Sequence, residues 1–260
     1  MSAQKALERL RAEIVRLCKN AVHPAAVERL DFRAHGDRFH VFFFGSPFGE
    51  PCGLTIEALS ANPIANSLLS FSLDGPDEGS NGTRNWDIAR LATSAVPFPA
   101  LRHIQIAHGQ PDHHNRTIVA EAYEEDGAIG CLVAKAPMLE TLISPSAPSR
   151  NFFDAPLRQL TTLAVDAGYD AQGFIEHLTQ VSPPNLQSFA WGEYAETYVD
   201  DWIDRTTGFS NMVGLFQSSA FRNFVLKNPT YSDQELRQLA GLRPGLQFKV
   251  VRTSSAYCGR

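Results

Sequence analysis

Hydrophobic residues recur along most of the chain in the order Leu-x-x-Leu-x-Leu, and the positions between them are mostly small or polar. Copies of this pattern begin at Leu68, Leu101, Leu139, Leu160, Leu186, Phe221 and Leu246. The copy at Leu139 is degraded, and the copy at Leu246 fits only with a shifted frame. Apolar residues at every second position are typical of strands that bury one face. The pattern therefore predicts a series of short strands that turn the same face to one core.

A helix is predicted before several of these strands, because two apolar residues at the helical spacing i, i+3 precede each of them. These pairs are Ile88/Leu91, Ile129/Leu132, Ile175/Leu178 and Leu236/Leu239. Asn85, Asp170 and Ser232 are residue types that cap helix N-termini, so we expect them to begin three of these helices. A proline stands two residues before the strand that follows each pair: Pro99, Pro137, Pro184 and Pro244. Helix, proline and strand therefore recur as one unit.

Strands that are joined through helices run parallel in a sheet. The repeated unit therefore predicts a parallel sheet with helices on one side, and the apolar strand residues should be buried between the two layers. We expect burial of Leu101, Ile104, Ile106, Leu163, Val165, Leu186, Phe189, Phe224 and Leu226.

The first part of the chain follows different patterns. Residues 3–22 predict an amphipathic helix, because one helical face carries apolar residues from Leu7 to Leu17. Apolar residues then alternate on either side of the turn His35-Gly36-Asp37, which predicts a β-hairpin. We expect residues 1–66 to form an N-terminal capping region, with a helix and a β-hairpin, for a repeat domain that spans residues 67–260.

The recurrence of the leucine frame with its proline and helix resembles the leucine-rich-repeat family, in which the frame is followed by a turn and a helix. The resemblance covers roughly residues 67–252. It implies an α/β fold, a leucine-rich-repeat solenoid with a curved parallel sheet and outer helices. The sequence departs from the family because the Asn or Cys after the last Leu is mostly missing and many repeats exceed the usual ~20–29 residues. An ordinary α/β domain with coincidental strand–helix units is the alternative.

Composition excludes several classes of ligand. The chain has 260 residues, 43% of them hydrophobic, and a formal net charge of −5. It has no Lys- or Arg-rich stretch that could follow a phosphate backbone, so we expect no direct nucleic-acid binding. No apolar run approaches the ~20 residues that cross a bilayer, and the start lacks the apolar core of a secretory signal. With four scattered cysteines, these features predict a cytoplasmic protein with reduced thiols, in which Cys131 is buried and inert.

A histidine-rich stretch is the best candidate for a metal site. HIQIAHGQPDHHNR contains side chains that can bind zinc: His103, His108, Asp112, His113 and His114. Their spacing in a loop gives no preformed tetrahedral site, so we interpret them as solvated side chains. The sequence also lacks a phosphate-binding glycine loop, a nucleophile elbow and an HExxH motif. We therefore expect no catalytic activity, no cofactor and no bound metal.

The strongest functional signal is the stretch WGEYAETYVDDWIDR, residues 191–205. It interleaves acids with aromatic rings; these residues are Glu193, Tyr194, Glu196, Tyr198, Asp200, Asp201, Trp202 and Asp204. In a helix the rings would form one stripe that packs inward, with the acids solvated. Alternatively, large amphipathic rings among acids form an anchor for a basic partner. In that interpretation the contact surface extends to Asp166, Tyr169 and Lys227 on neighbouring strand edges.

The positions between the strand leucines offer a flat surface of small polar side chains, which suits a protein ligand better than a small molecule. We therefore predict a protein-binding leucine-rich-repeat protein whose partner has a basic surface. One concrete version is an immunity protein or inhibitor that masks a toxin or nuclease. The alternatives are a metal-dependent enzyme that uses the His108–His114 loop and a regulatory scaffold. The sequence leaves the oligomeric state open.

Overall fold

The computed structural model of the chain describes residues 1–20, 28–77, 82–109, 113, 115–119, 125–167, 172–193 and 207–252. Within these ranges one large sheet holds its strands in the order β1-β2-β3-β5-β7-β8-β9-β10-β11. Their bounds are β1 (Arg29–His35), β2 (Arg38–Phe44), β3 (Leu68–Asp74), β5 (His103–Ile106), β7 (Thr141–Ser144), β8 (Thr162–Asp166), β9 (Ser188–Gly192), β10 (Asn223–Lys227) and β11 (Gln247–Val251). The order of the strands in the sheet follows their order along the chain.

The sheet is parallel from β2 to β11, as expected for strands joined through helices. β1 differs, because it forms an antiparallel hairpin with β2. The hairpin turns at Gly36, whose φ of 64° lies in the left-handed region that glycine adopts without strain. The sheet is open, and β1 and β11 form its edges among the strands described. The predicted hairpin and parallel sheet are confirmed.

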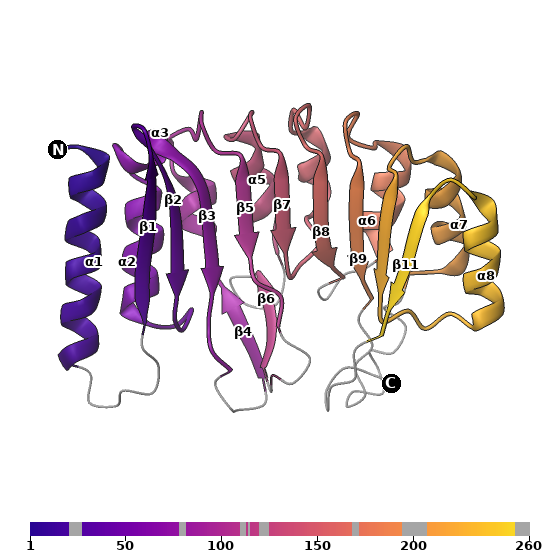
Figure 1. The fold of residues 1–260 in the computed structure, drawn as a ribbon, viewed down its shortest axis with the longest axis horizontal. Helices are drawn as coiled ribbons and strands as arrows, with labels where there is room; N and C mark the ends of the chain where they lie inside the picture. Colours follow the sequence, from indigo (N-terminus) through magenta and orange to yellow (C-terminus); the bar gives the residue numbers. More distant parts are fainter. Residues whose placement is uncertain are drawn as a thin grey trace.

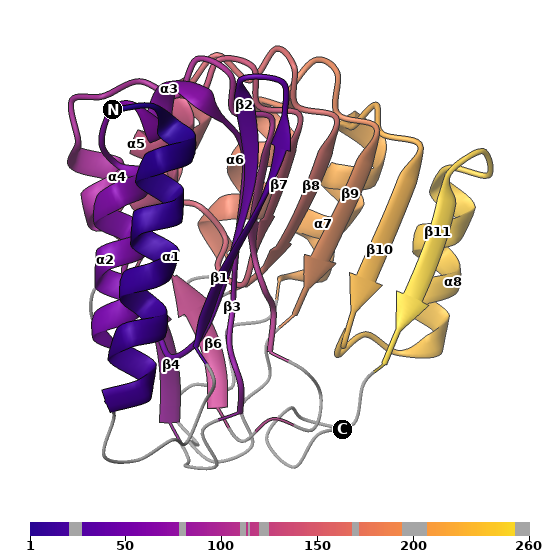
Figure 2. The same cartoon turned by 60° about the vertical axis from the view of Figure 1, so that its left-hand side comes forward.

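Helices cover one face of the sheet and leave the other face uncovered (Figure 1, Figure 2). They are α1 (Ala3–Asn20), α2 (Glu50–Leu59), α3 (Ile64–Ser67), α4 (Ala89–Thr93), α5 (Ala128–Ala134), α6 (Gln172–Gln180), α7 (Phe209–Ser218), α8 (Asp233–Leu242) and the 3-10 helix η1 (Arg150–Asp154). The strand residues predicted to be buried are all buried, and so are the paired apolar residues of the helices. None of the helices described is long and apolar enough to cross a membrane.

The recurring prolines shape the turns that lead into the strands. At Pro99, the Leu101 N–H donates to Phe98 O at 3.3 Å and closes a turn whose second residue is proline, where its fixed φ is favourable. The chain then joins the sheet, because the Arg102 N–H donates to Leu69 O at 2.8 Å. Equivalent bonds close the turns that end at Leu139, Leu186 and Leu246.

A second, two-stranded parallel sheet is formed by β4 (Gly82–Trp86) and β6 (Asn115–Val119), which the sequence did not predict. Arg84 of β4 is fully buried. Its guanidinium donates to Gly75 O at 2.9 Å, to Thr117 Oγ1 at 2.8 Å and to Pro76 O. A buried charge requires such partners, so Arg84 fixes the segment after β3 to the second sheet.

The predicted helix caps have different outcomes. Ser232 begins α8 with a capping box, since its Oγ accepts the Glu235 N–H at 3.3 Å and the Glu235 carboxylate accepts the Ser232 N–H at 2.8 Å. The prediction for Asn85 is wrong, because Asn85 lies in β4 and an Asp87 carboxylate oxygen accepts the first N–H of α4 at 2.8 Å. Asp170 lies outside the described residues.

The N-terminal helix α1 lies beside β1 at one end of the sheet (Figure 1). Leu7 and Ile14 are fully buried, which confirms the amphipathic helix. Arg11 lies over the ring of Phe32, 5.0 Å from its centre. Because β2 pairs with β3, the N-terminal elements share one sheet and one hydrophobic core with the units that follow.

Candidate functional site

The uncovered face of the sheet presents its side chains in rows, because paired residues of neighbouring strands lie side by side. One row is mostly polar: His40, Ser70, His103, Thr141, Thr162, Ser188, Asn223 and Gln247. The next row is small or apolar at its centre: Phe42, Ser72, Gln105, Ile143, Ala164, Ala190, Val225 and Lys249. These side chains are half-buried or exposed, so the face is accessible along its length.

Hydrogen bonds link neighbours within the polar row. His40 Nδ1 and Ser70 Oγ lie 2.8 Å apart, and Asn223 Nδ2 donates to Ser188 Oγ at 3.1 Å. Burial lowers the pKa of His40, and the neighbouring His103 lowers it further. His40 is therefore neutral at neutral pH, and its ring offers an uncharged donor or acceptor to a ligand.

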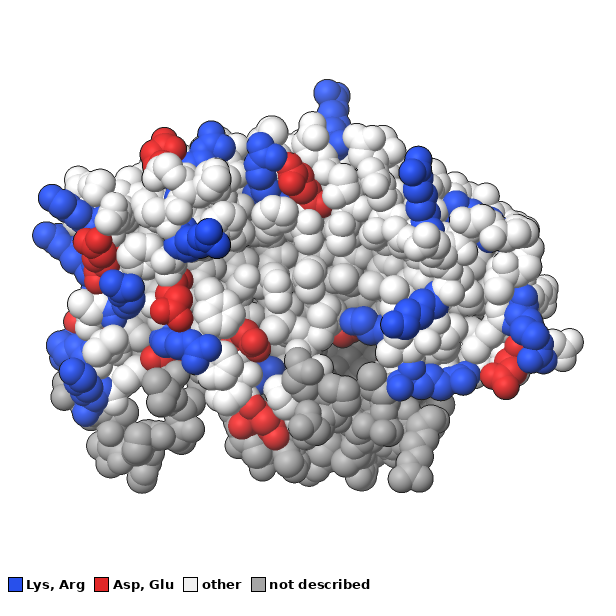
Figure 3. Space-filling view, viewed as in Figure 1, with Lys and Arg blue, Asp and Glu red and all other residues white. Residues whose placement is uncertain are grey.

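Charged side chains lie toward the margins of the uncovered face, and its middle is uncharged (Figure 3). At the β1 edge, Arg29 Nε and Asp31 Oδ2 lie 3.5 Å apart in an exposed ion pair. At the β11 edge, Lys249 is exposed. Because this face carries both signs of charge, its charge alone does not select the basic partner that the sequence predicts.

Asp166, at the end of β8, is the centre of a charged cluster. Its Oδ2 lies 2.5 Å from His108 Nδ1, and its Oδ1 accepts from Lys227 Nζ at 3.3 Å. The three side chains are 20% (His108), 30% (Asp166) and 29% (Lys227) exposed. Burial favours the neutral acid, but His108 and Lys227 outweigh it and hold the pKa of Asp166 below its usual value. Asp166 and Lys227 thus lie together, and their role in binding a partner stays a prediction.

Gly192 of β9 makes room for this cluster, because it lies between Asp166 and Lys227 in the register of the sheet. A Cβ atom at residue 192 would lie 2.0 Å from Asp166 Oδ1, which is shorter than any non-bonded contact. Sequence reasoning missed this residue. An isolated glycine inside a predicted strand is the signal that indicates such a close approach.

Glu193 directly follows β9 and turns into the protein, where it is 5% exposed. Its Oε2 accepts the Thr207 N–H at 3.0 Å; the Thr207 Oγ1 accepts from Trp191 Nε1 at 3.2 Å, and the Thr207 O accepts from the Tyr231 hydroxyl at 2.5 Å. Burial raises the pKa of Glu193, although the bond from Thr207 opposes this shift. The expectation that Glu193 belongs to an exposed acidic surface is therefore corrected. The hydrogen bond between the Glu193 carboxylate and the Thr207 N–H joins the two residues that flank residues 194–206.

The other residues of the predicted contact surface lie outside the described ranges: Tyr169, Tyr194, Glu196, Tyr198, Asp200, Asp201, Trp202 and Asp204. Their role as a partner anchor stays a prediction. Glu193 is described and lies next to the Asp166 cluster, because its backbone N–H donates to Lys227 O at 3.0 Å.

The described histidines of the candidate metal loop have different environments. His103 is exposed in the polar row, His108 contacts Asp166, and His113 is half-buried. Asp112 and His114 lie outside the described residues. Among the residues whose positions are described, no group of three or more His, Cys, Asp or Glu side chains is placed to hold a metal ion.

The prediction that Cys131 is buried is wrong. Cys131 is exposed on α5, with its Sγ 3.5 Å from Asn151 Nδ2. Adjacent helical residues point about 100° apart, so a core-facing Leu132 turns Cys131 outward. Cys52, by contrast, is buried, and burial raises the pKa of its thiol to about 12.

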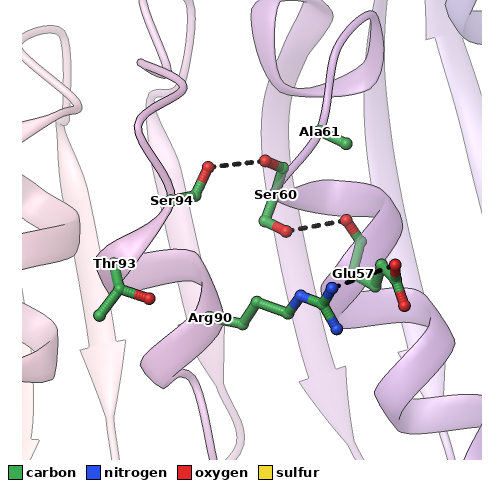
Figure 4. A pocket seen from close by; sticks show the side chains of 6 residues that line it. All are labelled: Glu57, Ser60, Ala61, Arg90, Thr93 and Ser94. Atoms are coloured by element: carbon green, nitrogen blue, oxygen red, sulfur yellow. Dashed lines mark hydrogen bonds and ion pairs between the residues drawn. The ribbon is translucent and has the colours of Figure 1, made fainter.

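An open pocket of about 390 Å³ lies on the helical side of the protein, between α2 and α4. Its lining residues are Glu57, Ser60, Ala61, Arg90, Thr93 and Ser94 (Figure 4). Arg90 Nη2 lies 3.1 Å from Glu57 Oε1, and Ser94 Oγ donates to Ser60 O at 2.8 Å. Because these groups already bond one another, the pocket is a weaker candidate site than the uncovered face.

A scan of the sequence against models of known protein families finds no match, and a search of curated proteins finds no match either.

Proposed function

We propose that this chain is a cytoplasmic, protein-binding leucine-rich-repeat protein that binds its partner with the uncovered face of the sheet and with residues 194–206. The observation that carries the proposal is the repetition of one strand–helix unit in which every strand leaves the same face uncovered. Stacked units of this kind present extended surfaces for protein ligands. Small side chains at the centre of the face, such as Ala164 and Ala190, keep it flat and accessible.

The proposed partner has a basic surface. The acids of residues 194–206, among them Asp200 and Asp201, would steer such a partner, and Tyr198 and Trp202 would supply desolvated anchors that charge alone cannot. The buried bond between Glu193 and Thr207 supports this proposal, because it holds together the two residues that flank the segment. One concrete version is an immunity protein or inhibitor that masks a basic toxin or nuclease.

A photo-crosslinking residue in place of Ala164 tests the face. The full-length protein is irradiated in a lysate of its own cells, and we expect one protein to be trapped. The same residue in place of Ala12, which is exposed on α1, should not trap that protein. With the purified partner, Ala164→Arg should weaken binding by about 2 kcal/mol or more, whereas Ala12→Arg should change it by less than about 0.5 kcal/mol. Equal effects of the two variants would refute the assignment of the face.

Charge reversal tests the acidic segment separately. Asp200→Lys with Asp201→Lys should slow association at low salt and flatten its salt dependence, whereas Trp202→Ala should mainly speed dissociation. Circular dichroism must first confirm that the variants fold. An unchanged association rate would remove these acids from the site. The immunity version further requires that the purified partner has a toxic or nuclease activity that equimolar protein inhibits.

A further inference from the structure

The two ends of the sheet are covered differently (Figure 1). At one end α1 lies against β1 and buries Leu7. At the other end β11 is the last strand of the described part. Phe248 and Val250 of β11 are only partly buried, although their register partners in β10, Phe224 and Leu226, are fully buried. Among the described residues, no element covers the last layer of the core on the side that faces away from β10.

The outer edge of β11 also carries backbone groups that point away from β10. The Gln247 N–H donates to Arg222 O at 2.9 Å, and Val251 O accepts the Asn228 N–H at 2.8 Å. Alternate residues of a strand direct their backbone groups to opposite edges. Since Gln247 and Val251 bond to the β10 side, Val250 directs its N–H and C=O outward. No described strand pairs with this edge.

Lys249 makes a second copy of the chain a poor occupant of the edge. In the antiparallel register that pairs all of Gln247–Val251 with itself, Lys249 lies directly opposite Lys249 of the second copy. Like charges in that position are destabilising, and edge lysines are a means by which natural sheets avoid self-pairing. Lys249 is exposed, and the ion pairs among the described residues do not include it. A carboxylate on a different protein would pair with it.

We propose that β11 accepts an extended segment of a partner protein as the next strand of the sheet, with a carboxylate opposite Lys249 and apolar side chains beside Phe248 and Val250. Main-chain hydrogen bonds provide the affinity of such strand addition, and alternate side chains provide its specificity. The segment would cover the open last layer of the core. The outer edge of β11 adjoins the uncovered face, to which Lys249 also belongs, but the inference does not depend on the function proposed above.

Two short synthetic peptides test strand addition on the full-length protein. Both alternate valine with threonine, and the central threonine is replaced by Glu in one peptide and by Lys in the other. Amide chemical shifts and hydrogen exchange at Val250 measure binding at millimolar peptide. We expect the Glu peptide to bind roughly three- to tenfold more tightly, because one cross-strand attraction replaces one repulsion, and to protect the Val250 amide. Lys249→Glu should reverse the preference, whereas Arg33→Glu on the opposite edge strand should leave it unchanged.

Val250→Pro removes the outward N–H at a position where an edge strand tolerates proline. It should abolish peptide binding while circular dichroism stays unchanged; if this variant does not fold, the reversal by Lys249→Glu decides the question alone. Equal affinities for the two peptides, or no binding of either, would overturn the proposal. A dimer of the wild-type protein in sedimentation that Val250→Pro dissociates would also overturn it, because the edge would then belong to a second copy.

Discussion

Replacing Gly192 by alanine tests the charged cluster at the end of β8. The backbone at Gly192 does not have the positive φ that an L-residue resists, so only the space above it is at issue. The new Cβ would lie 2.0 Å from Asp166 Oδ1 and 2.7 Å from Asp166 Cγ. The Asp166 carboxylate must therefore rotate away and lose its contacts with His108 at 2.5 Å and Lys227 at 3.3 Å.

The expected cost follows from the exposure of these groups. Fully exposed ion pairs contribute about 0.2–1 kcal/mol each, and this cluster, at 20% to 30% exposure, lies between exposed and buried pairs. Loss of two contacts should therefore lower the free energy of unfolding by about 1–3 kcal/mol near neutral pH. The penalty should shrink as pH falls through the lowered pKa of Asp166, because protonation removes the same attractions in the wild-type protein.

Urea unfolding of a double-mutant cycle isolates the cause. In an Asp166→Ala background the clashing carboxylate is absent, and a residual contact of 3.2 Å to Asp166 Cβ requires only a small shift. Gly192→Ala should then be within about 0.5 kcal/mol of neutral, because alanine also restricts the unfolded chain. A coupling energy of about 1–2 kcal/mol is expected. Equal penalties in the two backgrounds would refute the role of Gly192, because the cost would then arise from something other than Asp166.

Three further perturbations test the buried network and the thiols. Because the pKa of Glu193 is raised in the folded protein, Glu193 stabilises the fold fully below the ordinary Glu pKa of about 4.3, and this stabilisation is lost as pH rises through the folded pKa. Glu193→Gln should therefore remove this loss of stability in urea unfolding measured across pH. An unchanged slope of stability against pH would contradict this prediction. Tyr231→Phe deletes the donor to Thr207 O and should cost about 1–3 kcal/mol in thermal unfolding, whereas a neutral effect would mean that the bond does not matter. Maleimide should label Cys131 in the folded protein and label Cys52 only after unfolding, as mass spectrometry of the peptides will reveal.

The features of the fold that the sequence predicted are those set by local spacing. The leucine frame fixes which strand residues face the core, so positions such as Leu163 and Phe189 are buried as predicted. The proline before Leu101 has its effect within one turn, and Ser232 caps α8 through a residue three positions away. Each of these interactions is closed within a few residues, and a pattern along the chain is sufficient to find it.

The features that the sequence did not predict depend on residues far apart in the chain. Gly192 is required because of a carboxylate on the neighbouring strand, and Arg84 is buried because Thr117 and two carbonyl groups receive its guanidinium. Glu193 looks like one more surface acid in the sequence, yet Thr207, beyond the acidic segment, draws its carboxylate inward. For such residues, the type of side chain does not reveal the environment, because the partner is supplied only by the folded chain.

The agreement between the order of the strands in the sheet and their order along the chain has a consequence for synthesis. Each newly made strand finds its neighbour already in place, since β3 precedes β5, β5 precedes β7, and so on to β11. Register partners in neighbouring parallel strands are 21 to 38 residues apart along the chain, so each strand pairs with the strand made just before it and not with a distant one. The protein is therefore suited to fold progressively as it leaves the ribosome, in the N-to-C direction that translation imposes. In such a process α1 and the hairpin would act as the starting template for the strands that follow.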